Sequence, residues 1–151
     1  MISPKLRNGL EYLSRLMAGA SEPWWIIGST AMVLIEVDDI EPDDIDVVAS
    51  GVCLRQLLAK TGIAPALPTS HKKFRSVPYQ RISVTNGTEI ELMGDLAVHD
   101  GIKFQPLIIH SRVKIMIGEC EVYVPERTEQ IAIFNLFGRE KDLAKAAMLV
   151  H

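Results

Sequence analysis

The sequence predicts an α/β fold of the α+β kind, a mixed β-sheet flanked by helices with two helices at the C-terminal end. Leucines recur at helical spacing near the start of the chain, and apolar runs of strand length lie at 24–27 and 45–49. Between residues 79 and 124, turn residues separate further short apolar runs. Because helices and strands do not alternate regularly, we expect a mixed sheet rather than a parallel one.

The first half of the chain contains alternating helix and strand patterns. Ser3 before Pro4 is typical of a helix N-terminus. In order, we expect a helix from Ser3-Pro4 to about Gly19, a strand at 24–27, a helix entered through Gly28-Ser29-Thr30, a strand at 45–49, a helix from about 52 that Thr61-Gly62 ends, and a Pro-containing loop at 63–73.

The second half changes to short strands and ends in two helices. Asn86-Gly87 between two strand patterns is a strong signal for a tight hairpin, and Gly118-Glu119 has the same place in a second pair. We expect hairpin strands at 79–85 and 88–93, then at 112–117 and 120–124, and, after Pro125, helices at about 126–137 and 139–149 with Gly138 between them.

Length and composition bound the class of protein. A chain of 151 residues is expected to form one domain, 1–151. The net charge of −3 disfavours a dedicated nucleic-acid binder, so nucleic acid is expected only as a substrate. The N-terminus lacks the apolar core of a signal peptide, no apolar run has membrane-spanning length, and the two cysteines are isolated. We therefore expect a cytoplasmic protein with no membrane partner.

Two aspartates mark the strongest candidate site. Asp44 and Asp46 flank Ile45 at the start of a predicted strand, and alternate residues of a strand point to the same side. Neighbouring carboxylates repel each other unless a cation lies between them, which suggests a metal site. The alternative is an acidic strand start that continues the acidic loop at 36–43.

A third carboxylate is expected from the second strand of the first hairpin. Glu89 and Glu91 share one face of that strand. If the strand pairs beside the one carrying Asp44 and Asp46, one glutamate completes a three-carboxylate site. We favour Glu91, which lies deeper in the strand, over the alternative of a solvent-facing pair on an edge strand.

Two segments could bind phosphate. Gly28 and Ser29 lie at a predicted helix start, where free backbone N–H groups and the helix dipole favour an anion; the alternative is a plain N-cap by Ser29. Arg139 and Lys141 open the last helix, and they either reach phosphates or form a solvated helix start.

Together these residues resemble the nucleotidyltransferase fold superfamily (polymerase-beta-like), in particular its small prokaryotic branch of minimal and abortive-infection-type members. The resemblance covers about residues 24–150 and rests on Gly28-Ser29, Asp44-Ile45-Asp46, Glu91 and Arg139-Glu140-Lys141-Asp142. It implies that the Gly-Ser turn and the basic residues of the closing segment bind the nucleotide. It further implies that the three acids are catalytic and hold two Mg²⁺ ions for an in-line displacement.

Two main functions follow from this resemblance. The first is a Mg²⁺-dependent nucleotidyltransferase that moves an NMP from an NTP, such as ATP, to a hydroxyl of a small molecule, a protein or RNA. The second is a catalytically inactive binding module of this fold, or a toxin–antitoxin-like partner of another protein. An acidic cation-binding protein with no nucleotide role is a third possibility.

The chain departs from the pattern of its relatives at three positions. Phe134 stands where relatives often carry Lys, Ile40 lies where many have a basic residue ahead of Asp-x-Asp, and Glu91 replaces the usual Asp. The first two departures remove positive charge and favour the inactive binding module.

Overall fold

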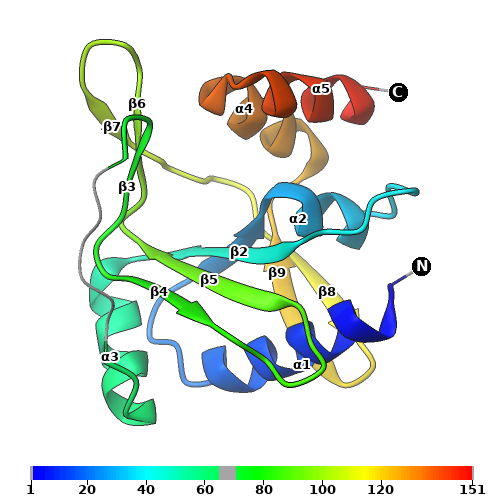
Figure 1. Cartoon of the computed structure of the whole chain (residues 1–151), viewed down its shortest axis with the longest axis vertical. Helices are drawn as coiled ribbons and strands as arrows, with labels where there is room; N and C mark the ends of the chain where they lie inside the picture. Colours follow the sequence, from blue (N-terminus) through cyan, green and yellow to red (C-terminus); the bar gives the residue numbers. More distant parts are fainter. Residues whose placement is uncertain (1, 65–70, 151) are drawn as a thin grey trace.

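The computed structural model describes residues 2–64 and 71–150, and a four-stranded mixed sheet lies at its centre (Figure 1). Strand β2 runs antiparallel to β1 and parallel to β5, and β4 runs antiparallel to β5. The predicted mixed sheet is therefore confirmed. Across the sheet the strands are β1 (Trp24–Ile27), β2 (Asp44–Ala49), β5 (Glu89–Gly94) and β4 (Tyr79–Ile82).

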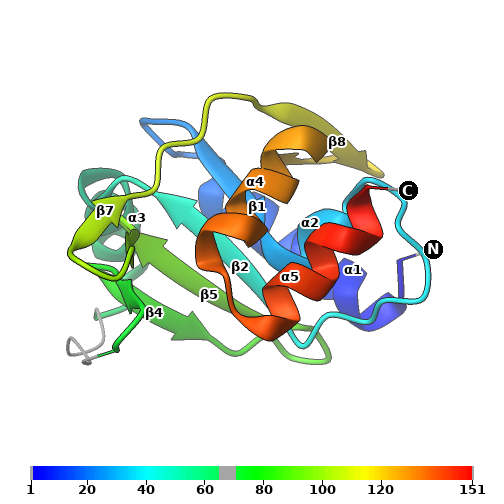
Figure 2. The ribbon, with the colours of Figure 1, turned by 90° about the horizontal axis from the view of Figure 1, so that it is seen from above.

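Helices cover both faces of this sheet (Figure 1, and from above in Figure 2). One face carries α1 (Pro4–Met17) and α3 (Gly51–Thr61). The other carries α2 (Gly28–Leu34), α4 (Arg127–Phe137) and α5 (Glu140–Leu149), so the two predicted C-terminal helices are present. Gly138 separates α4 from α5 with a φ of 69°, a left-handed conformation in which glycine commonly ends a helix.

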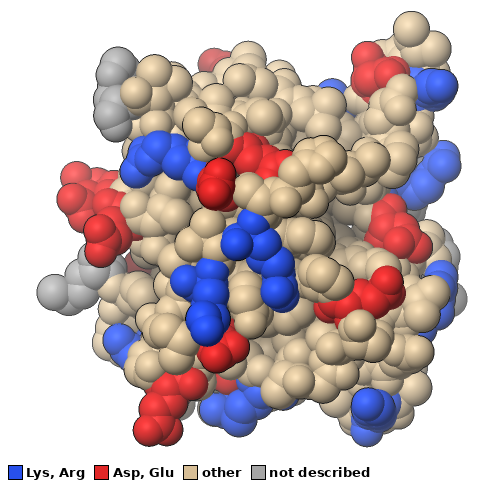
Figure 3. All heavy atoms as spheres, turned by 180° about the vertical axis from the view of Figure 1, so that it is seen from behind, with Lys and Arg blue, Asp and Glu red and all other residues tan. Residues whose placement is uncertain are grey.

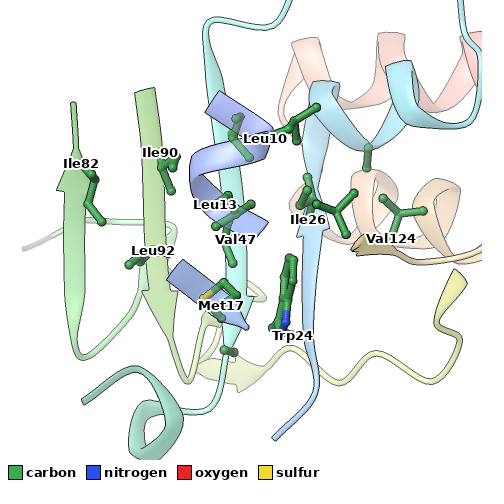
Figure 4. Close-up of a cluster of buried hydrophobic side chains, with 14 of the residues drawn as sticks. Leu10, Leu13, Met17, Trp24, Ile26, Val47, Ile82, Ile90, Leu92 and Val124 are labelled. Atoms are coloured by element: carbon green, nitrogen blue, oxygen red, sulfur yellow. The ribbon is translucent and has the colours of Figure 1, made fainter. Parts of the chain in front are cut away.

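Helix α1 forms because its start and its apolar stripe are both specified locally. Ser3 accepts a hydrogen bond from the Leu6 N–H, and Pro4 occupies the first turn. Side chains three or four residues apart then face the sheet and form the main core with it (Figure 4). The buried set includes Leu6, Leu10, Leu13 and Met17 of α1 and Ile26, Val47, Ile90 and Leu92 of the sheet.

In the described parts of the chain, five further strands lie outside the central sheet. A two-stranded hairpin of β8 (Val113–Ile117) and β9 (Cys120–Val124) confirms the second predicted hairpin, with Gly118-Glu119 as its turn. A small sheet in the order β3 (Phe74–Arg75), β6 (Ala97–His99) and β7 (Phe104–Pro106) was not predicted. Strands of two or three residues are too short to show an alternating pattern in sequence.

The first predicted hairpin exists, but the expected two-residue connection at Asn86-Gly87 is wrong, because the strands end at Ile82 and begin again at Glu89. Ile82 pairs with Ile90, which leaves residues 83–88 as the connection between β4 and β5. The Thr88 N–H donates to the Lys5 carbonyl of α1 instead of pairing across the hairpin. The chain still turns at this place, because the Gly87 N–H donates to the Val84 carbonyl and Asn86 has a φ of 55°. The strand ladder ends before this turn, at the Ile82–Ile90 pair. The expected loop at 63–73 lies partly outside the described residues.

The surface carries mixed charge. On the face opposite that of Figure 1, lysine and arginine side chains are interspersed with aspartate and glutamate (Figure 3). Among the described residues, no helix combines the length and the apolar character needed to cross a membrane.

Gly9 tests how closely α1 approaches the sheet. A Cβ at this position would lie 2.7 Å from the Thr88 carbonyl oxygen and 2.8 Å from Ile45 Cδ1. We expect Gly9→Ala to lower the free energy of unfolding by about 1–3 kcal/mol in urea titrations, despite alanine's higher helix propensity. The control is Gly19→Ala, whose nearest neighbour would be Lys60 Nζ at 3.9 Å, and which should change stability little. A fully stable Gly9→Ala would contradict the close packing.

Candidate active site

Three carboxylates meet on the face of the sheet that α2, α4 and α5 cover. Asp46 of β2 lies opposite Glu91 of β5 in the parallel ladder, and Asp44 lies two residues before Asp46 on the same face. Each acid offers an oxygen within 4.8 Å of the others'. Ile45 and Val47, which alternate with the two aspartates along β2, are fully buried on the opposite face. The structure thus brings together the three predicted acids.

Asp46 is the most electrostatically strained of the three. Burial, followed by the neighbouring charge of Glu91, raises its pKa to about 8, and the positive charge of Lys145 lowers it only in part. Its Oδ1 is buried and has no hydrogen-bond partner among the described residues. Burial and the charge of Glu91 also raise the pKa of Asp44. A buried carboxylate beside like charges is costly unless a cation shares the site.

Two residues of β4 lie beside the acids, and sequence reasoning missed both. Tyr79 donates a hydrogen bond from its hydroxyl to Glu91, and burial followed by this bond raises its pKa to about 12. Arg81 Nη2 lies 2.7 Å from Glu89 Oε2 and 3.6 Å from Asp44 Oδ1. The hydrogen bond with Glu89 raises the pKa of Arg81 well above its ordinary value. Only the pairing of β4 with β5 brings these residues to the site.

The Gly-Ser turn lies directly against Asp46. Gly28 has a φ of +75°, which L-residues with a side chain rarely adopt, and a Cβ there would lie 3.2 Å from Asp46 Oδ2. The N-cap of α2 is Ile27, and no side chain caps this helix, so the alternative of an N-cap by Ser29 is wrong. Thr30 Oγ1 donates to the Asp44 carbonyl at 2.8 Å and ties the start of α2 to β2.

A cleft of about 380 Å³ opens above the acids. The predicted Arg139 and Lys141 both line it. Arg139, however, donates from Nε and Nη2 to the buried Asp142 and lies over the Phe74 ring, so much of its hydrogen-bonding capacity is used within the protein. Other residues that line the cleft include Gly28, Ser29, Asp44, Asp46, His71, Tyr79, Glu91, Phe134, Phe137 and Lys145.

Lys145 is a further cation in the cleft that sequence reasoning missed. It is half-buried, and its Nζ lies 5.9 Å from the centroid of the Phe134 ring. Lys141 and Lys145 are one helical turn apart, so both lie on the cleft side of α5, and this spacing was the available signal. The chain thus places a cation from α5 beside Phe134, where a lysine on α4 was expected from relatives. Ile40, the other position where a basic residue was expected from relatives, is partly buried and packs against the core.

Two solved structures resemble this chain over nearly its full length. A proposed nucleotidyltransferase from Thermotoga maritima matches with a TM-score of 0.76 and 17% identity, covering 99% of this chain and 95% of that one. An antigenic nucleotidyltransferase-like protein from Paracoccidioides brasiliensis matches with a TM-score of 0.54 and 15% identity, covering 99% and 77%. No family model and no curated protein matches the chain. These similarities show that the chain has the nucleotidyltransferase fold.

The strained carboxyl of Asp46 predicts a pH-dependent stability. In the folded protein the Asp46 carboxyl group stays protonated up to about pH 8, because its pKa is raised. In the unfolded chain it loses its proton near the ordinary pKa of 3.8. Between these limits the folded state binds more protons, so stability falls as pH rises. Asp46→Asn removes this effect, and we expect it to stabilise the metal-free protein more at pH 8 than at pH 5 in urea titrations with EDTA.

The matched control for this prediction is Glu119→Gln, which removes an exposed carboxylate from the β8–β9 turn. Its effect on stability should not grow between the same two pH values. An Asp46→Asn variant that is less stable than wild type at pH 8 would contradict the assigned strain.

Proposed function

We propose that this protein is a Mg²⁺-dependent nucleotidyltransferase that transfers an NMP from an NTP to a hydroxyl acceptor. The observation that carries the proposal is the buried Oδ1 of Asp46, which has no hydrogen-bond partner among the described residues and lies beside Asp44 and Glu91 in the lining of a cleft. The fold supports the same function, because both similar structures are described as nucleotidyltransferases or as nucleotidyltransferase-like.

The donor set fits Mg²⁺. Asp44, Asp46 and Glu91 offer only carboxylate oxygens, which Mg²⁺ prefers, and each is partly accessible from the cleft. When bound there, the metal would neutralise negative charge on the reacting phosphate and on the attacking and leaving oxygens. The protein's part is to hold the three acids on two adjacent strands, so that they are in place before a nucleotide arrives.

The cleft walls supply groups for the phosphates. Gly28 leaves the backbone at the start of α2 open to a ligand, and we assign Ser29 as a hydroxyl donor beside it. Lys141 and Lys145 of α5 line the same cleft as this turn and, within the described part of the chain, form no ion pair. Because Arg139 is paired with Asp142, we assign it mainly to fixing the start of α5. Its positive charge also attracts the nucleotide phosphates.

The second candidate is an inactive nucleotidyltransferase-fold binding module, or one partner of a toxin–antitoxin-like pair. The specific observation in its favour is that Arg139 is already paired with Asp142 and that Phe134 contributes no charge. Among the residues that the structure describes, Lys141 and Lys145 are then the lysine and arginine side chains at the cleft that form no ion pair. Binding of such a protein to its partner would not depend on the three acids. The acceptor, the preferred NTP and any protein partner are left to experiment.

Calorimetric titration distinguishes these two functions. We expect the metal-stripped protein to bind an NTP only when Mg²⁺ is added, because the acids otherwise repel the phosphates. Asp44→Ala/Asp46→Ala should lose that binding while its circular dichroism spectrum is retained. Absence of binding heat with any NTP, from a folded wild-type protein, would favour the inactive module.

Transfer itself can be followed with NTPs labelled at the α-phosphorus and a cell extract as the source of acceptor. We expect label to move to an extract component with wild type, and Asp46→Asn to reduce this by more than the roughly 10–100-fold that loss of an outer metal-site partner costs. Equal labelling by Asp46→Asn would exclude this residue from the catalytic set.

Lys145 provides a test of the phosphate side of the cleft. A charge-assisted contact to phosphate contributes about 1.5–3 kcal/mol, so Lys145→Met should weaken Mg²⁺-NTP binding about tenfold or more. The matched control is Lys114→Met on β8, where the ammonium lies 3.8 Å from Glu121 and outside the cleft. Equal affinities for the two variants would show that Lys145 does not contact the nucleotide.

A further inference from the structure

Strand β4 holds the third carboxylate, Glu91, from two sides. Tyr79 and Arg81 are alternate residues of β4 and share the face on which Glu91 lies, because Arg81 pairs with Glu91 across the ladder. The Tyr79 hydroxyl donates to Glu91 Oε1, and Arg81 Nη1 lies 3.9 Å from Glu91 Oε2. Both oxygens of this carboxylate therefore have a neighbour on β4.

The two neighbours act differently on a carboxylate that must attract a cation. Arg81 is 46% exposed, and its closest contact is with Glu89 at 2.7 Å rather than with Glu91. As a positive charge it also opposes the binding of another cation nearby. Tyr79 is a neutral donor, so its hydrogen bond fixes the Glu91 side chain while it leaves the negative charge available. Tyr79 is therefore the contact that orients Glu91.

Glu91 needs such an anchor more than the two aspartates do. A glutamate side chain has one more rotatable bond than aspartate, and ordering it costs more conformational entropy. Asp44 and Asp46 follow the backbone of β2 more directly. The Tyr79 bond selects an arrangement of Glu91 in which its carboxylate lies within 4.8 Å of the oxygens of both aspartates.

We propose that Tyr79 is a positioning residue that holds Glu91 in the geometry in which it binds a divalent cation together with Asp44 and Asp46. This inference rests on the proposed function, because it takes the three acids to be metal ligands. Tyr79 acts through Glu91 and does not itself contact the metal or the reacting atoms.

The test is the affinity of the metal-stripped protein for Mn²⁺, followed by the electron paramagnetic resonance signal of the free ion. Tyr79→Phe removes one hydroxyl and keeps the ring. We expect it to weaken Mn²⁺ binding about tenfold, at the low end of the range for lost outer partners of metal ligands. The matched control is Tyr123→Phe on β9, which loses a 3.0 Å hydrogen bond to Glu121 away from the cleft and should bind Mn²⁺ like wild type.

A double-mutant cycle with Glu91→Asp tests whether Tyr79 acts through Glu91. The shorter acid cannot reach the Tyr79 hydroxyl in the same way, so Tyr79→Phe should change the Mn²⁺ affinity of the Glu91→Asp protein by less than about twofold. A tenfold loss in both backgrounds would overturn the assigned role.

The remaining outcomes separate this inference from the proposed function. The metal site is supported if the wild-type protein binds Mn²⁺ and the Asp46→Asn variant does not. If Tyr79→Phe then binds Mn²⁺ with unchanged affinity, the positioning role is wrong and the metal site stands, even if the variant is less stable to urea. Wild-type protein that binds no Mn²⁺ overturns both.

Discussion

The parallel pairing of β2 with β5 places Asp46 directly opposite Glu91, with Asp44 on the same face, and the candidate site depends on this arrangement. Burial and like charge raise the pKa of Asp46 to about 8, and its buried Oδ1 has no hydrogen-bond partner among the described residues. Arg81 partly neutralises Asp44 and Glu89, and the positive charge of Lys145 of α5 lowers the pKa of Asp46. These contacts reduce the repulsion only in part, which is why we infer a bound cation.

Apolar packing on the opposite face holds the acids together against this repulsion. Ile45, Val47, Ile90 and Leu92 alternate with the acids along β2 and β5, and each is at most 1% exposed. A slip of one residue would turn these side chains away from α1 and bury the carboxylates, at a cost of about 1.5–3 kcal/mol for each apolar side chain lost from the core. The core with α1 therefore fixes the register that the site requires.

The predictable part of the molecule is the part specified by local patterns. Strand alternation placed Asp44 and Asp46 on one face, and a capped apolar stripe located α1. What depends on pairing between distant segments was missed: Tyr79 and Arg81 reach the site only through the β4–β5 ladder. The chain turns at Asn86-Gly87 as predicted, but the two-residue hairpin was wrongly predicted, because Thr88 bonds to the backbone of α1 and not across the hairpin. The strands of the small sheet were too short to produce a pattern.

Anomalous diffraction from crystals soaked in Mn²⁺ with a non-hydrolysable NTP analogue tests the central claim most directly. The account predicts an anomalous peak in contact with carboxylate oxygens of Asp44, Asp46 and Glu91, with the phosphates of the analogue between the start of α2 and the lysines of α5. Ordered analogue or Mn²⁺ elsewhere, with no peak at the three acids, would contradict it.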